Sequence, residues 1–330
     1  YFPLEQVIRG FFTCMGRLYG LSFRRLENVP LWHDDARAYE VLDKWGARLG
    51  VVYMDLHARP GKRGGAWMDV CTCRRLLGSG NVQLPSCYVV CNFPAPGPEG
   101  CNLGHEEVLT LFHEGGHALQ HLLTRIDVPD VSGINGVYWD AVELPSMFNE
   151  RFAWQREALS FISAHRQTGE PLPEDKLKAL LEARNFHAAM KLVRQLEFGL
   201  FDWEVHALYE PGVTVAKEVL ARVRSEVAVV PVAPEDRFAN AFTHVFSGGY
   251  AAGYYSYKWA EVLDADAFSV FKREGIFNQE TAQRFRDSIL SKGGTEHPMV
   301  LYKRFRGGEP TIDALLERNG IQTPGKQNGE

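Results

Sequence analysis

The sequence lacks any apolar run close to the roughly 18 residues that a membrane span requires, so we predict a protein without membrane contact. No secretory signal peptide is recognisable at its start. The first residue is Tyr1 rather than Met, and we expect a cut or processed chain in which an upstream targeting segment would not be visible. The six cysteines, which we interpret as reduced thiols in a cytosol-like compartment, predict a cytoplasmic protein.

The chain also has few cysteines and no net positive charge. Six cysteines in 330 residues do not make a disulfide framework, and Cys71 and Cys73 are separated by one residue, not by the two of a zinc ribbon. We expect reduced thiols. A net charge of −5 argues against nucleic acid as a partner. The basic, glycine-rich residues 59–65 lack the spacing of a phosphate-binding loop, and we expect a turn there.

The overall composition is typical of a globular protein. It is 45% hydrophobic and 23% charged, long enough for one large domain or two lobes. Short β-prone runs predict strands at residues 51–56, 66–71 and 87–92. We predict an α+β, mainly α-helical fold with a disordered tail at 323–330. Apolar spacing predicts helices at residues 1–20, 34–48, 106–123, 140–165, 174–184, 186–208, 214–226, 235–245, 257–273, 280–291 and 311–319.

One segment carries a pattern that is typical of metal chemistry. Residues 113–117 read His-Glu-Gly-Gly-His inside an apolar segment predicted as a buried helix. Positions four apart lie on one face of a helix, so His113 and His117 can present two imidazoles to one metal ion. Glu114 would lie beside them, placed to act on the attacking water. The pattern indicates a zinc hydrolase with one zinc ion per chain.

A chance match is the alternative interpretation. With 11 histidines in the chain, random placement gives this pattern in roughly a few per cent of such sequences. Two histidines and a glutamate on an apolar helix are costly to bury unless they are paired or bind a metal. Gly115 and Gly116 each cost a helix about 1 kcal/mol relative to alanine, which the close approach of another backbone or of a substrate would explain. We therefore favour the metal site.

Catalytic zinc usually has three protein ligands. His121 shares the face of His113, but residues 113 and 121 are about 12 Å apart along a straight helix, too far for one ion. We interpret His121 as a packing residue or a support for a ligand. Glu143, 26 residues after His117, is the stronger candidate. Asp140 precedes it by one helical turn and could orient a histidine ligand, although a helix N-cap is an equally good interpretation.

A third group lies far along the chain, at residues 247–257. It contains four tyrosines and three glycines in eleven residues. Tyrosine hydroxyls can donate to the oxyanion that forms when water attacks a peptide carbonyl. Packing is the usual role of an aromatic-rich stretch, but beside a zinc site we interpret this one as catalytic.

Taken together, these segments resemble the M3 family of zinc metallopeptidases, the thimet oligopeptidase and oligopeptidase A group. The resemblance covers nearly the whole chain and rests on linked motifs that occur in order. They are Tyr1-Phe2-Pro3-Leu4, Gly61-Lys62-Arg63-Gly64-Gly65-Ala66-Trp67-Met68-Asp69, His105-Glu106-Glu107-Val108, Val131-Ser132-Gly133, Trp139-Asp140-Ala141-Val142-Glu143-Leu144-Pro145-Ser146, Thr168-Gly169-Glu170-Pro171-Leu172-Pro173, Arg194-Gln195-Leu196-Glu197-Phe198 and Gly248-Gly249-Tyr250.

The resemblance implies a zincin-like metallopeptidase catalytic domain over residues 1–322, with the small sheet beside the zinc helix. It implies Glu114 as general base. The other residues that it implicates are the zinc ligands His113, His117 and Glu143, the substrate and oxyanion tyrosines Tyr250, Tyr254 and Tyr257, and His244, which stands where bacterial members carry a histidine.

Two positions depart from the family pattern: Gly115 stands where the family usually has Phe, and Met147 where it usually has Gln. Family members are also about twice this length, so the chain resembles their catalytic C-terminal half. We predict a zinc-dependent endopeptidase acting on short peptides. The alternatives are a peptidyl-dipeptidase, for which cations near residues 303–306 would grip the substrate C-terminus, and a non-catalytic peptide-binding half that needs an N-terminal half as its partner.

Overall fold

Helix α1 (Leu4–Tyr19) opens the chain in the computed structural model, which describes residues 1–98 and 100–321. Its apolar residues recur every three to four positions, so one face is buried among the largest core cluster. Helix α1 packs against α5 (Arg156–Ile162) and α12 (Gln279–Phe285), which come from distant parts of the sequence. The predicted helix at residues 1–20 is thus confirmed, whereas the predicted tail at 323–330 lies outside the described residues.

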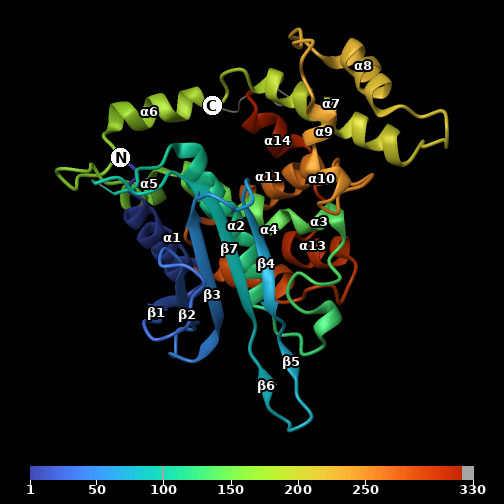
Figure 1. Cartoon of the computed structure of the whole chain (residues 1–330). Helices are drawn as coiled ribbons and strands as arrows, with labels where there is room; N and C mark the ends of the chain where they lie inside the picture. The colour runs from blue at the N-terminus through green and yellow to red at the C-terminus, as the bar shows by residue number, and fades with distance from the viewer. Residues whose placement is uncertain (99, 322–330) are drawn as a thin grey trace.

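A five-stranded sheet positions the site. Its spatial order is β1 (Ser22–Arg25), β2 (Arg37–Leu42), β3 (Arg48–His57), β7 (Ser86–Phe93) and β4 (Trp67–Thr72). β3 and β7 run parallel and the other neighbours antiparallel. β4 is therefore an edge strand, paired on one side only (Figure 1). Strands β5 (Arg75–Leu76) and β6 (Val82–Gln83) form a separate short hairpin.

Helix α2 (His105–Leu122) packs against β7 and lies next to β4. α4 (Leu144–Glu150) packs against its other side, and α11 (Ser256–Glu274) packs against α4. These layers bury one large core that joins α1, the sheet, α2, α4 and the C-terminal helices. No helix in the described ranges combines the length and apolar character that spanning a bilayer takes.

The remaining helices extend from this core. A second, smaller apolar cluster lies between α7 (Ala188–His206), α8 (Ala216–Val227) and α10 (Thr243–Phe246), and α7 and α8 project together from the body (Figure 1). The other elements are the 3₁₀ turns Pro129–Val131 and Arg151–Trp154, α3 (Trp139–Val142), α6 (Glu174–Ala183), α9 (Phe238–Ala241), the π-helical segment Arg286–Leu290, α13 (Pro298–Arg306) and α14 (Asp313–Arg318).

The predicted helix at residues 34–48 is wrong, because β2, a turn and the start of β3 occupy these residues. Asp43 accepts backbone hydrogen bonds from Trp45 and Ala47 through its side chain, and Gly46 has a φ of 83°, which closes a hairpin between the two strands. The long helix predicted at 140–165 is split into α3, α4, a 3₁₀ turn and α5. Pro145 begins a new helix at α4, since proline suits the first helical turn.

Two other differences are smaller. The helix predicted at 235–245 is reduced to the single turns α9 and α10. Helix α13 was not predicted, although Pro298 at its start and Gly307 at its end are ordinary helix boundary signals.

Candidate metal centre and active site

Three potential ligand side chains converge where α2 and α4 pack together. The ligand atoms of His113, His117 and Glu143 all lie within 4.8 Å of one another. Glu143 Oε2 is 3.2 Å from His113 Nε2 and 3.3 Å from His117 Nε2. Two imidazole nitrogens and a carboxylate oxygen that face one point are a donor set suited to a divalent metal ion.

Electrostatics in this group also favour a shared cation. Burial opposes ionisation of Glu143, but the positive charge and hydrogen bonds of the two histidines outweigh it and hold the pKa of Glu143 well below its usual range. Burial likewise opposes protonation of His113, yet hydrogen bonds to Glu143 and Glu150 raise the pKa of His113 well above its usual value. The site is thus built to hold positive charge between these side chains.

The glycine pair allows α2 to approach its neighbours closely. A Cβ at Gly116 would lie 2.5 Å from the carbonyl oxygen of Pro145, so only glycine lets α4 bring Glu143 this near to the two histidines. A Cβ at Gly115 would lie 2.5 Å from a ring carbon of Phe11 on α1. Close approach of another backbone therefore explains Gly116, and close approach of an aromatic ring explains Gly115.

Glu150 supports the first histidine, a role that the sequence suggested for Asp140, with a helix N-cap as the equally good interpretation. His113 Nδ1 is 2.7 Å from Glu150 Oε1, which turns Nε2 toward Glu143. Asp140 makes no such contact within the described residues. The missed signal was the spacing: Glu150 lies seven residues after Glu143, two turns away on the same face.

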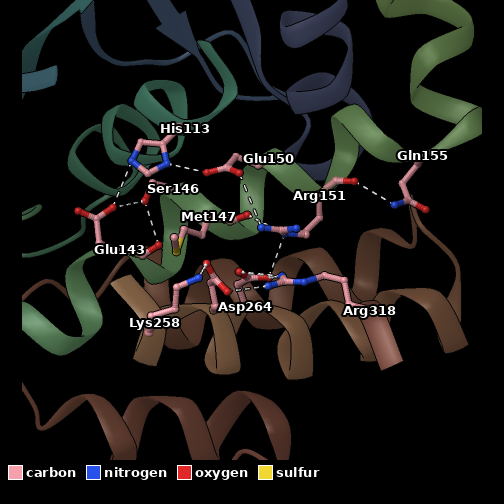
Figure 2. A network of polar contacts seen from close by, with 11 residues as sticks. His113, Glu143, Ser146, Met147, Glu150, Arg151, Gln155, Lys258, Asp264 and Arg318 are labelled. Atoms are coloured by element: carbon pink, nitrogen blue, oxygen red, sulfur yellow. Dashed lines mark hydrogen bonds and ion pairs between the residues drawn. The ribbon is translucent and has the colours of Figure 1, made fainter. Parts of the chain in front are cut away.

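Glu150 belongs to a chain of charged groups that leads away from the metal group (Figure 2). Arg151 lies 3.7 Å from Glu150 and 3.0 Å from Asp264 of α11, a fully buried carboxylate. Arg318 of α14 donates to the same carboxylate at 2.9 Å. The support of His113 is thereby anchored to two helices near the end of the described chain.

Glu114 faces the cleft beside the histidines but belongs to no hydrogen bond in the described part of the chain. It is 6% exposed. Burial raises the pKa of its carboxyl, although the charges of His113 and His117 act in the opposite direction. A carboxylate with a raised pKa beside a metal group can accept a proton and release it again.

Two of the predicted tyrosines reach the same place. The Tyr250 hydroxyl donates to Glu143 Oε1, and the Tyr257 ring stacks on that of Tyr250 with centroids 5.0 Å apart. Burial, reinforced by the charge of Glu143, raises the pKa of both tyrosines, so both hydroxyls stay protonated and can donate. His244 lines the same cleft. Burial lowers the pKa of His244.

Tyr254 is placed differently. Its hydroxyl donates to Gln195 of α7 at 3.1 Å, and it is not among the residues that line the cleft. Burial raises the pKa of Tyr254 to about 12. Its hydroxyl could serve a substrate only if the bond to Gln195 broke. His121, interpreted from the sequence as a packing residue or a support for a ligand, is buried away from the group, with Nε2 2.9 Å from the carbonyl oxygen of Thr72.

One cleft of about 980 Å³ is lined by the metal group, the candidate base and the two hydroxyl donors, namely His113, His117, Glu143, Glu114, Tyr250 and Tyr257. Residues 63–68, which include the start of the edge strand β4, form one wall, and Trp139, His244 and Tyr250 are on another. The cleft therefore places an unpaired strand edge alongside a metal-ligand group, a candidate base and two hydroxyl donors.

The sequence matches Peptidase family M3 over residues 1–321. The chain belongs to this family. It is 52% identical to oligopeptidase A of Escherichia coli (strain K12) over 325 residues, which are 98% of this chain and 48% of that protein. It is 34% identical to dipeptidyl carboxypeptidase of the same organism, over 97% of this chain and 47% of that protein. The M3 chain described here thus spans about half the length of the curated relatives that it matches.

The fold of this chain is also seen in solved structures. PZ peptidase A with inhibitor 2 superposes with a TM-score of 0.55 at 17% identity, over 81% of this chain and 42% of that one. This match concerns the fold alone. Two positions depart from the M3 pattern. At Gly115, the ring of Phe11 fills the space that a side chain at this position would occupy. Met147 lies half-buried on α4 between Glu143 and Glu150.

Proposed function

We propose that this chain is the catalytic part of a zinc-dependent endopeptidase that hydrolyses short oligopeptides. The observation that carries the proposal is the convergence of His113, His117 and Glu143 beside the buried carboxylate of Glu114. Family membership supports the reaction class. The donor set favours zinc, which binds imidazole and carboxylate ligands in hydrolases of this kind.

When bound by His113, His117 and Glu143, zinc would polarise the peptide carbonyl and favour the ionisation of water. Glu114 accepts the proton of the attacking water and returns it to the leaving amine, a role suited to its raised pKa. Tyr257, held protonated, donates a hydrogen bond to the oxyanion as it forms, and Tyr250, also protonated, joins it when its hydroxyl turns from Glu143 to the oxyanion.

Strand β4 would bind the substrate. One of its edges pairs with β7 and the other has no strand partner, and its first residues, Trp67 and Met68, line the cleft. An extended peptide can add to such an edge as a further strand, which brings its backbone carbonyls past the metal group. Main-chain recognition of this kind suits peptides short and flexible enough to become extended.

A peptidyl-dipeptidase is the second candidate, and one relative carries the name dipeptidyl carboxypeptidase. The cations that we expected to serve it are engaged elsewhere: Lys303 pairs with Glu309, Arg304 with Glu296 and Arg306 with Asp266. None of the three is among the residues that line the cleft. This arrangement favours the endopeptidase.

The first test uses an unstructured peptide of about ten residues, with and without chelator. The wild-type chain should cleave it internally and lose activity with the metal. In Glu114→Gln, zinc content should stay unchanged while kcat falls by about 10²-fold or more, because the base is removed but no ligand is. Zinc loss in this variant would contradict the role of Glu114, and peptide binding without turnover in the wild type would favour the non-catalytic alternative.

The second test concerns Tyr257→Phe, which keeps the ring and its stacking on Tyr250. If the hydroxyl donates to the oxyanion, kcat should fall by roughly 10²–10³-fold with KM nearly unchanged. Tyr250→Phe and Tyr254→Phe are the comparison variants, and they would act more on KM if their hydroxyls also hold the substrate backbone. Full activity in all three variants would leave these tyrosines as packing residues only.

A further inference from the structure

The segment that carries Tyr250 and Tyr254 has no regular secondary structure of its own. Residues 247–255 form a succession of turns between α10 and α11 and include three glycines. Ala252 has a φ of 52°, in the left-handed region that a residue with a Cβ rarely adopts. A segment of this kind holds one shape only if its surroundings impose it.

Asp202 of α7 makes the contacts that impose this shape. Its Oδ1 accepts the backbone N–H of Ala252 at 2.9 Å, and its Oδ2 accepts the backbone N–H of Tyr254 at 2.8 Å. The carboxylate is 1% exposed, and His206 Nδ1 lies 2.9 Å from Oδ1. Both oxygens of one buried carboxylate thus bind the turn at the strained alanine and two residues beyond it.

The same helix also holds the side chain of Tyr254. Gln195 precedes Asp202 by seven residues, two helical turns on one face, and accepts the Tyr254 hydroxyl. Backbone bonds then pass this restraint along the segment, because Gly253 N donates to the Tyr250 carbonyl and Tyr257 N to the Tyr254 carbonyl. The position of Tyr250 therefore depends on a turn that α7 fixes, and the same turn leads directly into the start of α11, which carries Tyr257.

We propose that Asp202 is a positioning residue, which clamps the turn at Ala252 and Tyr254 to α7 and so places the Tyr250 hydroxyl beside Glu143 and the Tyr250 ring against that of Tyr257. The expected effect on kcat rests on the proposed function, whereas the clamp itself does not. Asp202 itself is not among the residues that line the cleft. Loss of the clamp should disturb the tyrosines and leave the metal group and the β4 edge intact.

The experiment compares Asp202→Ala and Asp202→Asn with a matched control on the same helix. Glu197 is also buried, at 2% exposed, but it pairs with Arg194 and Arg224 and makes no contact with the tyrosine segment. Glu197→Gln should leave kcat and KM unchanged, whatever it does to stability. Each variant is measured for zinc content, thermal unfolding, kcat, KM and amide hydrogen exchange.

In Asp202→Ala, kcat should fall by about 10²-fold, the scale expected when reacting groups shift by about 1 Å, with KM and zinc content close to wild type. Asp202→Asn keeps one oxygen acceptor, so its loss of kcat should be smaller. The amides of Ala252 and Tyr254 should exchange faster in both variants but not in the control. If Asp202→Ala does not fold, Asp202→Asn supplies the same readouts.

The proposal is overturned if either variant retains wild-type kcat, or if the amides of Ala252 and Tyr254 keep their protection. It is also overturned if activity falls only in proportion to the loss of zinc or of folded protein, which is what a purely structural role predicts. Failure of the proposed function is separate: a wild-type chain that cleaves no peptide would refute that function, and amide exchange would still decide whether Asp202 clamps the turn.

Discussion

A single hydrogen bond sets the orientation of one histidine in the metal group, and Glu150 provides it. Replacing this carboxylate in Glu150→Gln removes the charge that holds the ring of His113 but none of the three proposed ligands. We expect zinc affinity to fall by about 10–100-fold, the usual effect of losing a carboxylate that supports a histidine ligand. Competition against a chromophoric chelator measures it.

Asp140→Asn is the matched control, because it changes a carboxylate to an amide three residues before Glu143 without altering any contact to His113. Its zinc affinity should match that of the wild type. A larger effect at Asp140 than at Glu150 would reverse the assignment made from the structure.

At the scale of elements, the packing of α1 on α2 depends on Gly115. Phe11 is buried, and its ring also contacts Phe112 at a centroid distance of 5.2 Å, so it has little room to move away from a new Cβ. Gly115→Ala should therefore lower the free energy of unfolding by about 1–3 kcal/mol, although alanine is the better helix former. Chemical denaturation measures this change.

The same substitution at Gly199 is its control. Gly199 lies within α7, and a Cβ there would have no atom within 4 Å, so Gly199→Ala should raise the free energy of unfolding by up to about 1 kcal/mol. The double variant Gly115→Ala with Phe11→Leu should recover part of the loss. If Gly115→Ala proves as harmless as Gly199→Ala, the contact with Phe11 does not constrain the helix.

Elements with a strong local pattern could be predicted from the sequence. Helices α1, α2 and α11 show apolar residues at helical spacing and were confirmed close to their predicted limits. Residues 34–48 were mistaken for a helix because their apolar residues fit either period, and the turn formed by Asp43 and Gly46 decides the outcome. Residues 37–42 also need β3 as a pairing partner, and the spacing of apolar residues carries no information about pairing.

In the candidate site, too, residues close together in the sequence could be predicted and residues that act across separate elements could not. His113, Glu114 and His117 lie within five residues, so their spacing on one helix indicates their arrangement directly. Glu150 and Asp202 were missed because each acts through a contact between separate elements: Glu150 with His113 across α4 and α2, and Asp202 with Ala252 across 50 residues of chain. Only packing brings such groups together.

At the scale of the whole molecule, acid should unfold the protein partly through Asp55. This buried carboxylate accepts hydrogen bonds from Trp32, Arg59 and Lys62. Burial would raise its pKa, but these partners outweigh burial and hold it below the usual value of 3.8. Asp55 therefore stabilises the folded state above pH 3.8, and this contribution is lost as the pH falls below that value.

The test compares wild type with Asp55→Asn over a range of pH. At pH 7 the variant should lose about 3–5 kcal/mol, because the buried Lys62 keeps only backbone carbonyl acceptors and no opposite charge, and the difference should shrink as the pH falls below 3.8. Glu174→Gln is the control, since its pair with Arg156 is exposed and contributes little. A difference in the free energy of unfolding between wild type and Asp55→Asn that stays the same at every pH would contradict the role of Asp55.

The packing of α1 against α12 also has a consequence during synthesis. The first helix finds its partner at residues 279–285, and the Gln279 amide donates to the Arg17 carbonyl. A nascent chain grows from its N-terminus, so all three proposed metal ligands leave the ribosome long before the helices that cover α1 and α4. The sheet, α2 and α5 can cover most of the apolar face of α1 early, whereas its contact with α12 must form last, and contacts this distant in sequence form slowly. The final packing around the three candidate ligands is therefore expected only after most of the described chain has been translated.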